Sequence, residues 1–471
     1  MMNFKGISYY LGLFCFPISI LAFINILYSS YFDYFLSIHS YISTLVISLL
    51  IGFSLFFIGK KTSKRINFIE QLILVILVYL FSSFLISIPF YLGNYQVTFI
   101  NSFFESVSGL TGTGFSIFNN IKYLDPTLIL WRSSSQWIGG LYFLSFLILI
   151  FSNKQFTYKM SNLTYSGDGS INSENNIKGL LLKIFIIYTV LSFVIFLSLN
   201  IAEVRMFNSL NLSMSLISTG GFLPSNSLNN IIDTNAKKIV FIMSLLLSML
   251  NFFLIFNIFE KKIIEREHKE DFYLIILSII FILLVYFNDY SGLDIIISVL
   301  SSLSNSGLSL LNSDNNLGLY FLLIASLGGS LISNSSGIKF MRIYILLKTS
   351  SLEIIKLISP NTIMNKNIFS SENKITDENI KTSFLIFISF FLSLFILSGI
   401  LTIDNITFES SFKLSILTIT NTVTSAMYGI NEINFANLLT TSKFSLILFM
   451  IIGKIELISF FLIIKKIFFK D

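Results

Sequence analysis

The feature that most constrains this chain is a pattern that occurs four times along it. Each time, an apolar span is followed by a short amphipathic segment, a polar loop rich in Gly, Ser and Thr, and a second apolar span. Polar, irregular backbone between membrane helices is tolerated only where it is buried in protein or lines a water-filled path. The pattern therefore predicts four loops that surround one axis. The loop residues are Thr111, Gly112, Thr113 and Gly114; Ser218, Thr219, Gly220 and Gly221; Ser304, Asn305, Ser306 and Gly307; and Asn421, Thr422, Val423 and Thr424.

The composition places the whole chain in a membrane. Of its 471 residues, 54% are hydrophobic and 12% are charged, with a mean hydropathy of +0.80, whereas a soluble domain has about 25% charged residues. Apolar stretches long enough to cross a bilayer recur along its length. The single Cys15 and the two distant histidines, His39 and His268, exclude a disulfide framework and a histidine metal cluster. The sequence shows no phosphate-binding loop, dinucleotide fingerprint or catalytic triad.

The distribution of positive charge predicts the orientation of the chain. Short basic clusters follow alternate spans, as in segments 60–65, 154–183 and 261–269, and the positive-inside rule places them in the cytoplasm. The four polar loops then face the outside. We expect a multi-pass protein of the cell (plasma or inner) membrane with cytoplasmic N- and C-termini. Nucleic-acid binding is disfavoured, because the basic clusters are short and lie beside the membrane.

These patterns predict an all-α polytopic membrane protein in which two leading helices precede four helix–pore loop–helix repeats around one pseudo-fourfold pore. The two leading helices fall in residues 1–66. The repeats are 67–160, 161–268, 269–350, with a broken second helix, and 351–471. The half-spanning helices are expected near 101–110, 206–217, 293–303 and 409–420.

The second span of the third repeat, near 318–347, contains a run of small and polar residues. Such residues weaken a helix and favour its unwinding, and a break at membrane depth should face a cavity. A close-packed crossing of helices through small residues is the alternative, but the following Lys339 and Arg342 favour the break. We expect this segment to be the gate, just inside the loops, with Lys339 and Lys454 repelling cations. The small and polar residues are Gly328, Gly329, Ser333, Asn334, Ser335, Ser336 and Gly337.

The loop chemistry is typical of a site for monovalent cations. The C-terminal end of each short helix carries about half a negative charge, and backbone carbonyls can replace the water shell of an ion. No loop carries Asp or Glu at its core, which argues against divalent ions. Glu105 can be an ion ligand at the pore mouth or a support for the first loop, and we favour support. Lys454 can snorkel toward the cytoplasm or face the cavity, and its position near the middle of a span favours the cavity.

Several motifs resemble, in the same order, those of the Trk/Ktr/HKT superfamily of cation transporters. Segment 103–116 resembles the first pore loop of that family, and segment 218–222 resembles its second filter. Segment 335–339 followed by Arg342 is similar to its broken helix, and segment 453–456 to the Gly-Arg-Leu-Glu motif of its last helix. The resemblance covers about residues 70–470, and the two leading spans make the chain resemble the TrkH branch.

The resemblance implies a potassium-uptake subunit, not an enzyme, with one pore per chain. It also implies a homodimer and a cytoplasmic nucleotide-binding regulatory ring (TrkA/KtrA-like), with K⁺ or Na⁺ as the transported ion and no further cofactor. The filter glycines of the family map onto Gly114, Gly221 and Gly307, while Thr424 falls at the fourth position. This departure leaves a sodium or mixed Na⁺/K⁺ transporter open. Passive flow and symport are both open as the mechanism. A membrane enzyme or assembly subunit is the more distant alternative, disfavoured by the lack of catalytic groups.

Overall fold

The computed structural model describes residues 3–33, 38–60, 66–151, 177–252, 254, 269–286, 292–311, 317–360, 365–369, 374–430 and 433–455. Over these residues the chain is helical, with one isolated β-bridge between Asn367 and Lys374 and no strand. The expected all-α fold class is therefore confirmed. The basic segments expected on the cytoplasmic side, at 60–65, 154–183 and 261–269, lie largely outside the described residues.

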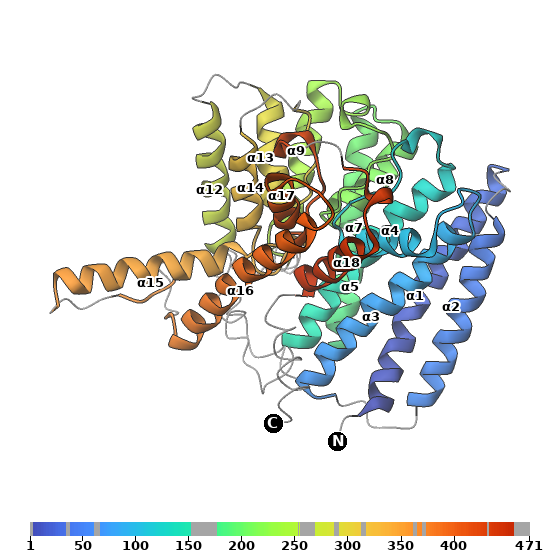
Figure 1. Ribbon diagram of the computed structural model, residues 1–471, viewed down its shortest axis with the longest axis horizontal. Helices are drawn as coiled ribbons and strands as arrows, with labels where there is room; N and C mark the ends of the chain where they lie inside the picture. The colour runs from blue at the N-terminus through green and yellow to red at the C-terminus, as the bar shows by residue number, and fades with distance from the viewer. Residues whose placement is uncertain are drawn as a thin grey trace.

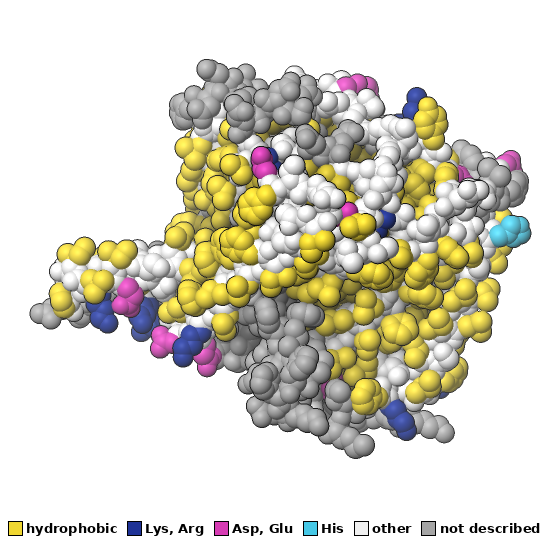
Figure 2. All heavy atoms as spheres, in the orientation of Figure 1, with side chains coloured by type: hydrophobic (Ala, Val, Ile, Leu, Met, Phe, Trp, Pro, Cys, Tyr) yellow, Lys and Arg dark blue, Asp and Glu magenta, His cyan; other side chains and the backbone are white. Residues whose placement is uncertain are grey.

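Long apolar helices form the body of the protein (Figure 1). Parts of α1, α2, α3, α7 and α16 are long and apolar enough to cross a membrane by length and composition. Exposed side chains on them, such as Leu50 and Phe57, are apolar, and Figure 2 shows a broad apolar surface. The long helices are α1 (Phe4–Tyr31), α2 (Ile38–Gly59), α3 (Phe68–Leu92), α5 (Pro126–Phe151), α7 (Ile177–Ile201), α9 (Asn235–Met249), α12 (Lys269–Tyr286), α15 (Phe340–Ile358), α16 (Asp377–Thr402) and α18 (Thr440–Ile455). We group α14 (Gly318–Leu327) with them, although it has only 10 residues, because it takes the same place in the third repeat.

Short helices occur at the four places where the sequence predicts them, with ends within two residues of the expected ones. Their inner turns are buried, and serine is frequent among the buried side chains. A helix satisfies its own backbone hydrogen bonds inside the protein, but its last carbonyls need other partners. The ends of these helices are therefore where polar chemistry is concentrated. The short helices are α4 (Phe99–Thr111), α8 (Met206–Ile217), α13 (Leu293–Ser304) and α17 (Phe408–Ile419).

The short helices pack in a closed cycle. Each one contacts the long helices before and after it in the chain, and also one long helix from the preceding repeat. Thus α8 contacts α5, α13 contacts α9, and α17 contacts α14. The cycle closes because α4, the first short helix, contacts α18, the last described helix. This arrangement encloses a single central region bordered by all four short helices.

The chain leaves the helical conformation between α14 and α15. Three residues of this break have positive φ: Gly328 at +69°, Gly337 at +81° and Lys339 at +76°. Its backbone is hydrogen-bonded to the end of α9, where Ser330 donates to Met249 O at 3.0 Å and Ile332 O accepts from Phe252 at 2.9 Å. The expected break is present and buried, and α15 beyond it projects from the body of the protein (Figure 1).

Candidate functional site

The four loops begin with the same backbone turn. We number them loop 1 (111–114), loop 2 (218–221), loop 3 (304–307) and loop 4 (421–424). One residue in each has a left-handed conformation and donates its N–H to the carbonyl three residues earlier, at 3.0 to 3.2 Å. Glycine, and to a lesser degree asparagine, tolerates this conformation. These residues are Gly112 (φ +78°), Thr219 (φ +55°), Asn305 (φ +65°) and Asn421 (φ +49°).

The next backbone hydrogen bond divides the loops into two pairs. In loops 1 and 3, the N–H groups of Gly114 and Gly307 donate to the carbonyl six residues earlier, both at 3.3 Å. In loops 2 and 4, the N–H groups of Gly220 and Thr422 donate to the carbonyl five residues earlier, at 2.7 and 2.9 Å. The site therefore alternates between two loop geometries around the cycle of short helices.

The shared turn aligns the loops residue by residue and changes the expected register of loop 4. Two residues after the left-handed position stand Gly114, Gly221 and Gly307 in the first three loops. The same step in loop 4 leads from Asn421 to Val423, so Thr424 lies one residue too far. Loop 4 has neither a glycine nor a positive φ at Val423, so the turn geometry does not mark a filter position there in the way that it does in loops 1 and 3.

The four loops are in contact with one another. A Cβ atom placed on Gly114 would lie 2.9 Å from the Cα of Gly221 and 3.0 Å from the Cβ of Val423. One placed on Gly307 would lie 2.6 Å from the carbonyl oxygen of Val423. On another part of the loops, one on Gly112 would lie 3.6 Å from the carbonyl oxygen of Ser218. The structure thus brings all four expected loops together at one place.

Side-chain amides join neighbouring loops. Asn421 of loop 4 donates to the hydroxyl of Thr113 in loop 1, at 2.9 Å. Asn305 of loop 3 donates to the hydroxyl of Thr422 in loop 4, at 3.2 Å. Both amides also donate to a backbone carbonyl of the following long helix, Asn421 to Met450 and Asn305 to Ala325. The left-handed asparagines therefore shape their loops and hold them to the surrounding helices.

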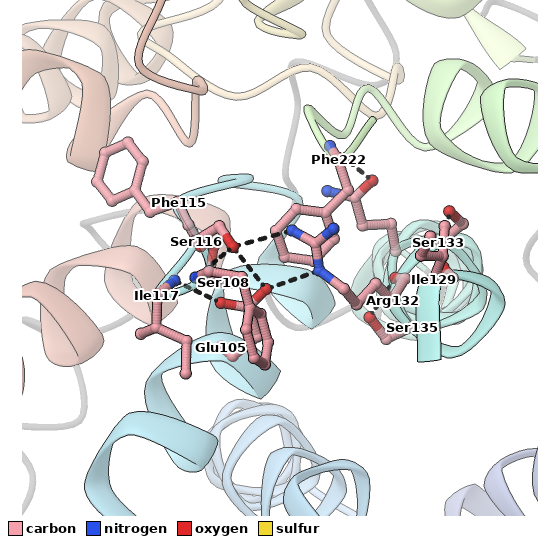
Figure 3. Close-up of polar contacts among 12 residues, drawn as sticks. Glu105, Ser108, Phe115, Ser116, Ile117, Ile129, Arg132, Ser133, Ser135 and Phe222 are labelled. Atoms are coloured by element: carbon pink, nitrogen blue, oxygen red, sulfur yellow. Dashed lines mark hydrogen bonds and ion pairs between the residues drawn. The ribbon is translucent and has the colours of Figure 1, made fainter. Parts of the chain in front are cut away.

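Glu105 lies under loop 1, with its carboxylate enclosed by donors (Figure 3). The side chain is fully buried and accepts hydrogen bonds from the N–H of Ile117 at 2.8 Å and from Arg132 Nε at 2.8 Å. The Arg132 guanidinium stacks 4.1 Å from the centre of the Phe222 ring, which follows loop 2. Because the Glu105 carboxylate is already paired with Arg132, it is poorly placed to bind an ion, and its geometry suits a role in supporting loop 1. Sequence reasoning did not predict the pairing of Arg132 with Glu105, because the two residues are 27 positions apart in the chain.

The break segment contacts loop 2 through Asn334. The side-chain amide of Asn334 donates to Ile217 O at 2.8 Å, and its backbone carbonyl accepts from the hydroxyl of Thr219 at 3.1 Å. The same carbonyl accepts from Lys454 Nζ at 2.9 Å. Lys339 turns back on the segment and donates to the carbonyls of Ser333, at 3.2 Å, and Ser335. Of the expected gate residues, Ser333, Asn334, Ser335 and Lys339 therefore form one buried cluster with Lys454 beside loop 2.

Two buried acidic residues at the start of α12 accept hydrogen bonds from the backbone of the break segment and of the residues after α9. Glu270 accepts from the N–H of Leu331 in the break, at 2.9 Å, and Asp271 accepts from the N–H of Asn251 after α9, at 2.8 Å. Sequence reasoning missed both, because they follow a basic cluster and resemble the solvated end of a membrane span. Two adjacent acids at the very start of an apolar span are the signal that could have indicated burial.

The arrangement defines a class of protein: a polytopic helical membrane protein in which four polar loops, each following a short helix, meet at one place. The family model of the cation transport protein TrkH matches residues 37–276. This match covers more than half of the chain, and the chain belongs to the TrkH family of cation transport proteins.

Relatives and one solved structure match most of the chain. It is 22% identical to the Trk system potassium uptake protein TrkH of Escherichia coli strain K12 over 462 residues, which is 92% of each chain. It is 25% identical to an uncharacterized cation transporter of Methanocaldococcus jannaschii over 73% of each chain. The crystal structure of the potassium transporter TrkH from Vibrio parahaemolyticus superposes with a TM-score of 0.86, at 19% identity and 98% coverage of both chains.

Proposed function

We propose that this protein carries potassium into the cell through a filter formed by loops 1 to 4. The observation that supports it most directly is the closed cycle of short helices, whose C-terminal loops meet at one place. Each helix directs the negative end of its dipole at that place. Carbonyl oxygens and helix dipoles attract a cation without fixing a net charge, as conduction requires. Two Escherichia coli relatives, the Trk system potassium uptake proteins TrkH and TrkG, support potassium as the ion.

The membrane potential is a sufficient driving force for this uptake. A potential of about 100 mV supplies about 2.3 kcal/mol per monovalent charge, which corresponds to about fifty-fold accumulation. The site needs no bound cofactor for such a reaction, and both passive flow and symport are compatible with it. Because loop 4 lacks the glycine of the other three loops, a sodium or mixed Na⁺/K⁺ transporter is the second candidate. The family match argues against a membrane enzyme or assembly subunit.

The proposed gate is the break between α14 and α15. Its residue Asn334 is fixed between Lys454 and loop 2, so the segment lies where it can close the path next to the filter. Lys339 and Lys454 add positive charge there, which disfavours a cation in the closed state. Movement of α15, which begins one residue after Lys339, would pull directly on the segment.

The proposed assembly is a homodimer with a cytoplasmic nucleotide-binding ring of the TrkA/KtrA type. The relatives named as parts of a Trk system support a multi-component complex. The ring would dock on the basic cytoplasmic segments and act on the gate through α15. We also propose that both termini lie in the cytoplasm of a plasma or inner membrane.

Reconstitution in liposomes tests the function. Purified protein in vesicles with an inside-negative potential should take up rubidium, and the reversal potential should follow the K⁺ gradient more closely than the Na⁺ gradient. A reversal potential that follows Na⁺ would favour the second candidate. Vesicles that hold folded protein but conduct neither ion would refute the proposal. Empty vesicles and vesicles with an unrelated membrane protein are the controls.

A further inference from the structure

One apolar side chain lies among the four loops of the proposed filter. A Cβ placed on Gly221 would collide with the Cβ of Val423 and come within 2.7 Å of its Cγ1 and 3.0 Å of its Cγ2. The isopropyl group of Val423 therefore occupies the space in front of Gly221. In the cycle of short helices, loops 2 and 4 are opposite each other. The side chain thus reaches across the ring from one loop to the opposite one.

The same side chain also contacts the two remaining loops. A Cβ on Gly114 would lie 3.0 Å from Val423 Cβ and Cγ2, and a Cβ on Gly307 would lie 2.8 Å from Val423 Cγ1. Val423 is partly exposed, whereas the three glycines are buried. One side chain therefore fills the space that three glycines leave open, and it does so at the rim of the ring.

We propose that Val423 forms an apolar constriction at the mouth of the filter, in series with the gate on the other side of the loops. This inference rests on the proposed function of the loops. An isopropyl group offers no hydrogen bond to an ion or to its water, and a hydrophobic constriction closes a path by excluding water. An ion can pass only when the side chain moves away from the three glycines. Val423 then limits the rate of passage while the gate is open, and it discriminates most strongly against the larger monovalent cations.

Removal of the side chain tests the proposal. Val423→Gly should raise K⁺ flux about tenfold, equivalent to a barrier lowered by about 1.4 kcal/mol, and raise Cs⁺ flux by more than K⁺ flux. Val423→Ala should lie between, and it provides the test if the glycine variant does not fold. Val423→Thr keeps the shape but adds a hydroxyl, so a raised flux in that variant would identify exclusion of water as the barrier. Val194→Ala, at a half-exposed valine of α7, is the matched control and should change nothing.

A second measurement does not depend on transport. The chain has a single cysteine, Cys15, which is buried. In a Cys15→Ser background, Val423→Cys should react with a charged, membrane-impermeant thiol reagent added from outside, and the modification should block flux. The control Val107→Cys, at a buried position of α4, should not react.

The outcomes separate the two proposals. If the wild type conducts and Val423→Gly and Val423→Ala leave both the K⁺ flux and the Cs⁺ to K⁺ ratio unchanged, the constriction is refuted and the transport function stands. A Val423→Cys protein that folds and conducts but does not react from outside would also refute it. If neither the folded wild type nor the folded variants conduct, the transport function itself fails.

Discussion

The ammonium group of Lys454, on α18, donates a hydrogen bond of 2.9 Å to the backbone carbonyl of Asn334, at the break after α14. The same carbonyl accepts from Thr219 of loop 2. One carbonyl therefore joins the last described helix, the break segment and the proposed filter. Lys454 also lies near loop 1, since a Cβ on Gly112 would be 3.8 Å from its Nζ. A charge in this position can hold the break closed and repel an arriving cation.

Replacement of Lys454 should loosen the gate. We expect Lys454→Met to raise K⁺ flux about tenfold, because it removes both the hydrogen bond to Asn334 and the positive charge beside the loops. Lys454→Arg keeps the charge and is the matched control, and it should conduct close to the wild-type rate. Flux in reconstituted vesicles measures both. Equal flux in all three proteins would exclude Lys454 from gating.

Shortening the break should separate gating from ion preference. A deletion of Ser333–Ser336 removes the contacts of Asn334 with loop 2 and the carbonyls that bind Lys339. We expect higher flux and weaker regulation by nucleotide, with an unchanged ratio of K⁺ to Na⁺ permeability. Asn334→Ala is the milder companion, since it removes the side-chain bond and keeps the carbonyl. A deletion variant that folds and transports at the wild-type rate with intact regulation would place the gate elsewhere.

The space in front of Gly221 should hold one side chain only. Gly221→Ala adds a Cβ where Val423 already lies, so K⁺ uptake should fall at least about tenfold. The double variant Gly221→Ala with Val423→Gly exchanges the two groups and should recover much of that loss. Gly399→Ala on α16, where a Cβ meets open space, is the control for a glycine replacement. If the effects of the two substitutions on K⁺ uptake simply add in the double variant, the two residues do not share this space.

A carboxylate at this position is the stronger change. Gly221→Asp should abolish normal potassium uptake while the protein stays folded in the membrane, because the new charge would trap or redirect ions. Unchanged uptake kinetics and K⁺ to Na⁺ preference in Gly221→Asp would remove Gly221 from the filter.

The ion pair between Glu105 and Arg132 should matter for stability. Both side chains are almost fully buried, and removal of one partner from such a pair costs about 3 to 5 kcal/mol. Glu105→Ala and Arg132→Ala should each lower the unfolding temperature in detergent, and the double variant should lose less than the sum. Asp233→Asn, which breaks the exposed pair with Lys237, is the control and should leave the temperature unchanged. Additive losses would show that the two side chains act independently.

The sequence predicted the short helices and the break well, because strong local signals mark them. The helices α4 and α14 both end directly before a glycine. Long apolar runs flank the short helices in the sequence and so limit where they can lie. The register of loop 4 was harder, since Asn421 takes the left-handed turn without a glycine to mark it. The family resemblance placed the fourth position at Thr424, whereas the shared backbone turn aligns Val423 with Gly114, Gly221 and Gly307.

Contacts between distant segments could not be read from local patterns. The pairing of Glu105 with Arg132 depends on how α4 packs against α5, and the burial of Glu270 depends on the path of the break. The side chain of Val423 gains its position only when four loops from the whole chain meet. Such proximity depends on packing between segments far apart in the chain, which local residue patterns do not specify.

The closed cycle of short helices has a consequence for how the protein is made. α4 is among the first elements to enter the membrane, yet one of its packing partners is α18, the last described helix. Loop 1 therefore cannot reach its final contacts until almost the whole chain has been synthesised and inserted. Until then, α4 lacks one of its packing partners, and the hydroxyl of Thr113 lacks the hydrogen bond that the Asn421 amide donates to it. The cycle of short helices is therefore closed only after α18 has inserted, and a chain cut before α18 would insert its early helices without ever closing it.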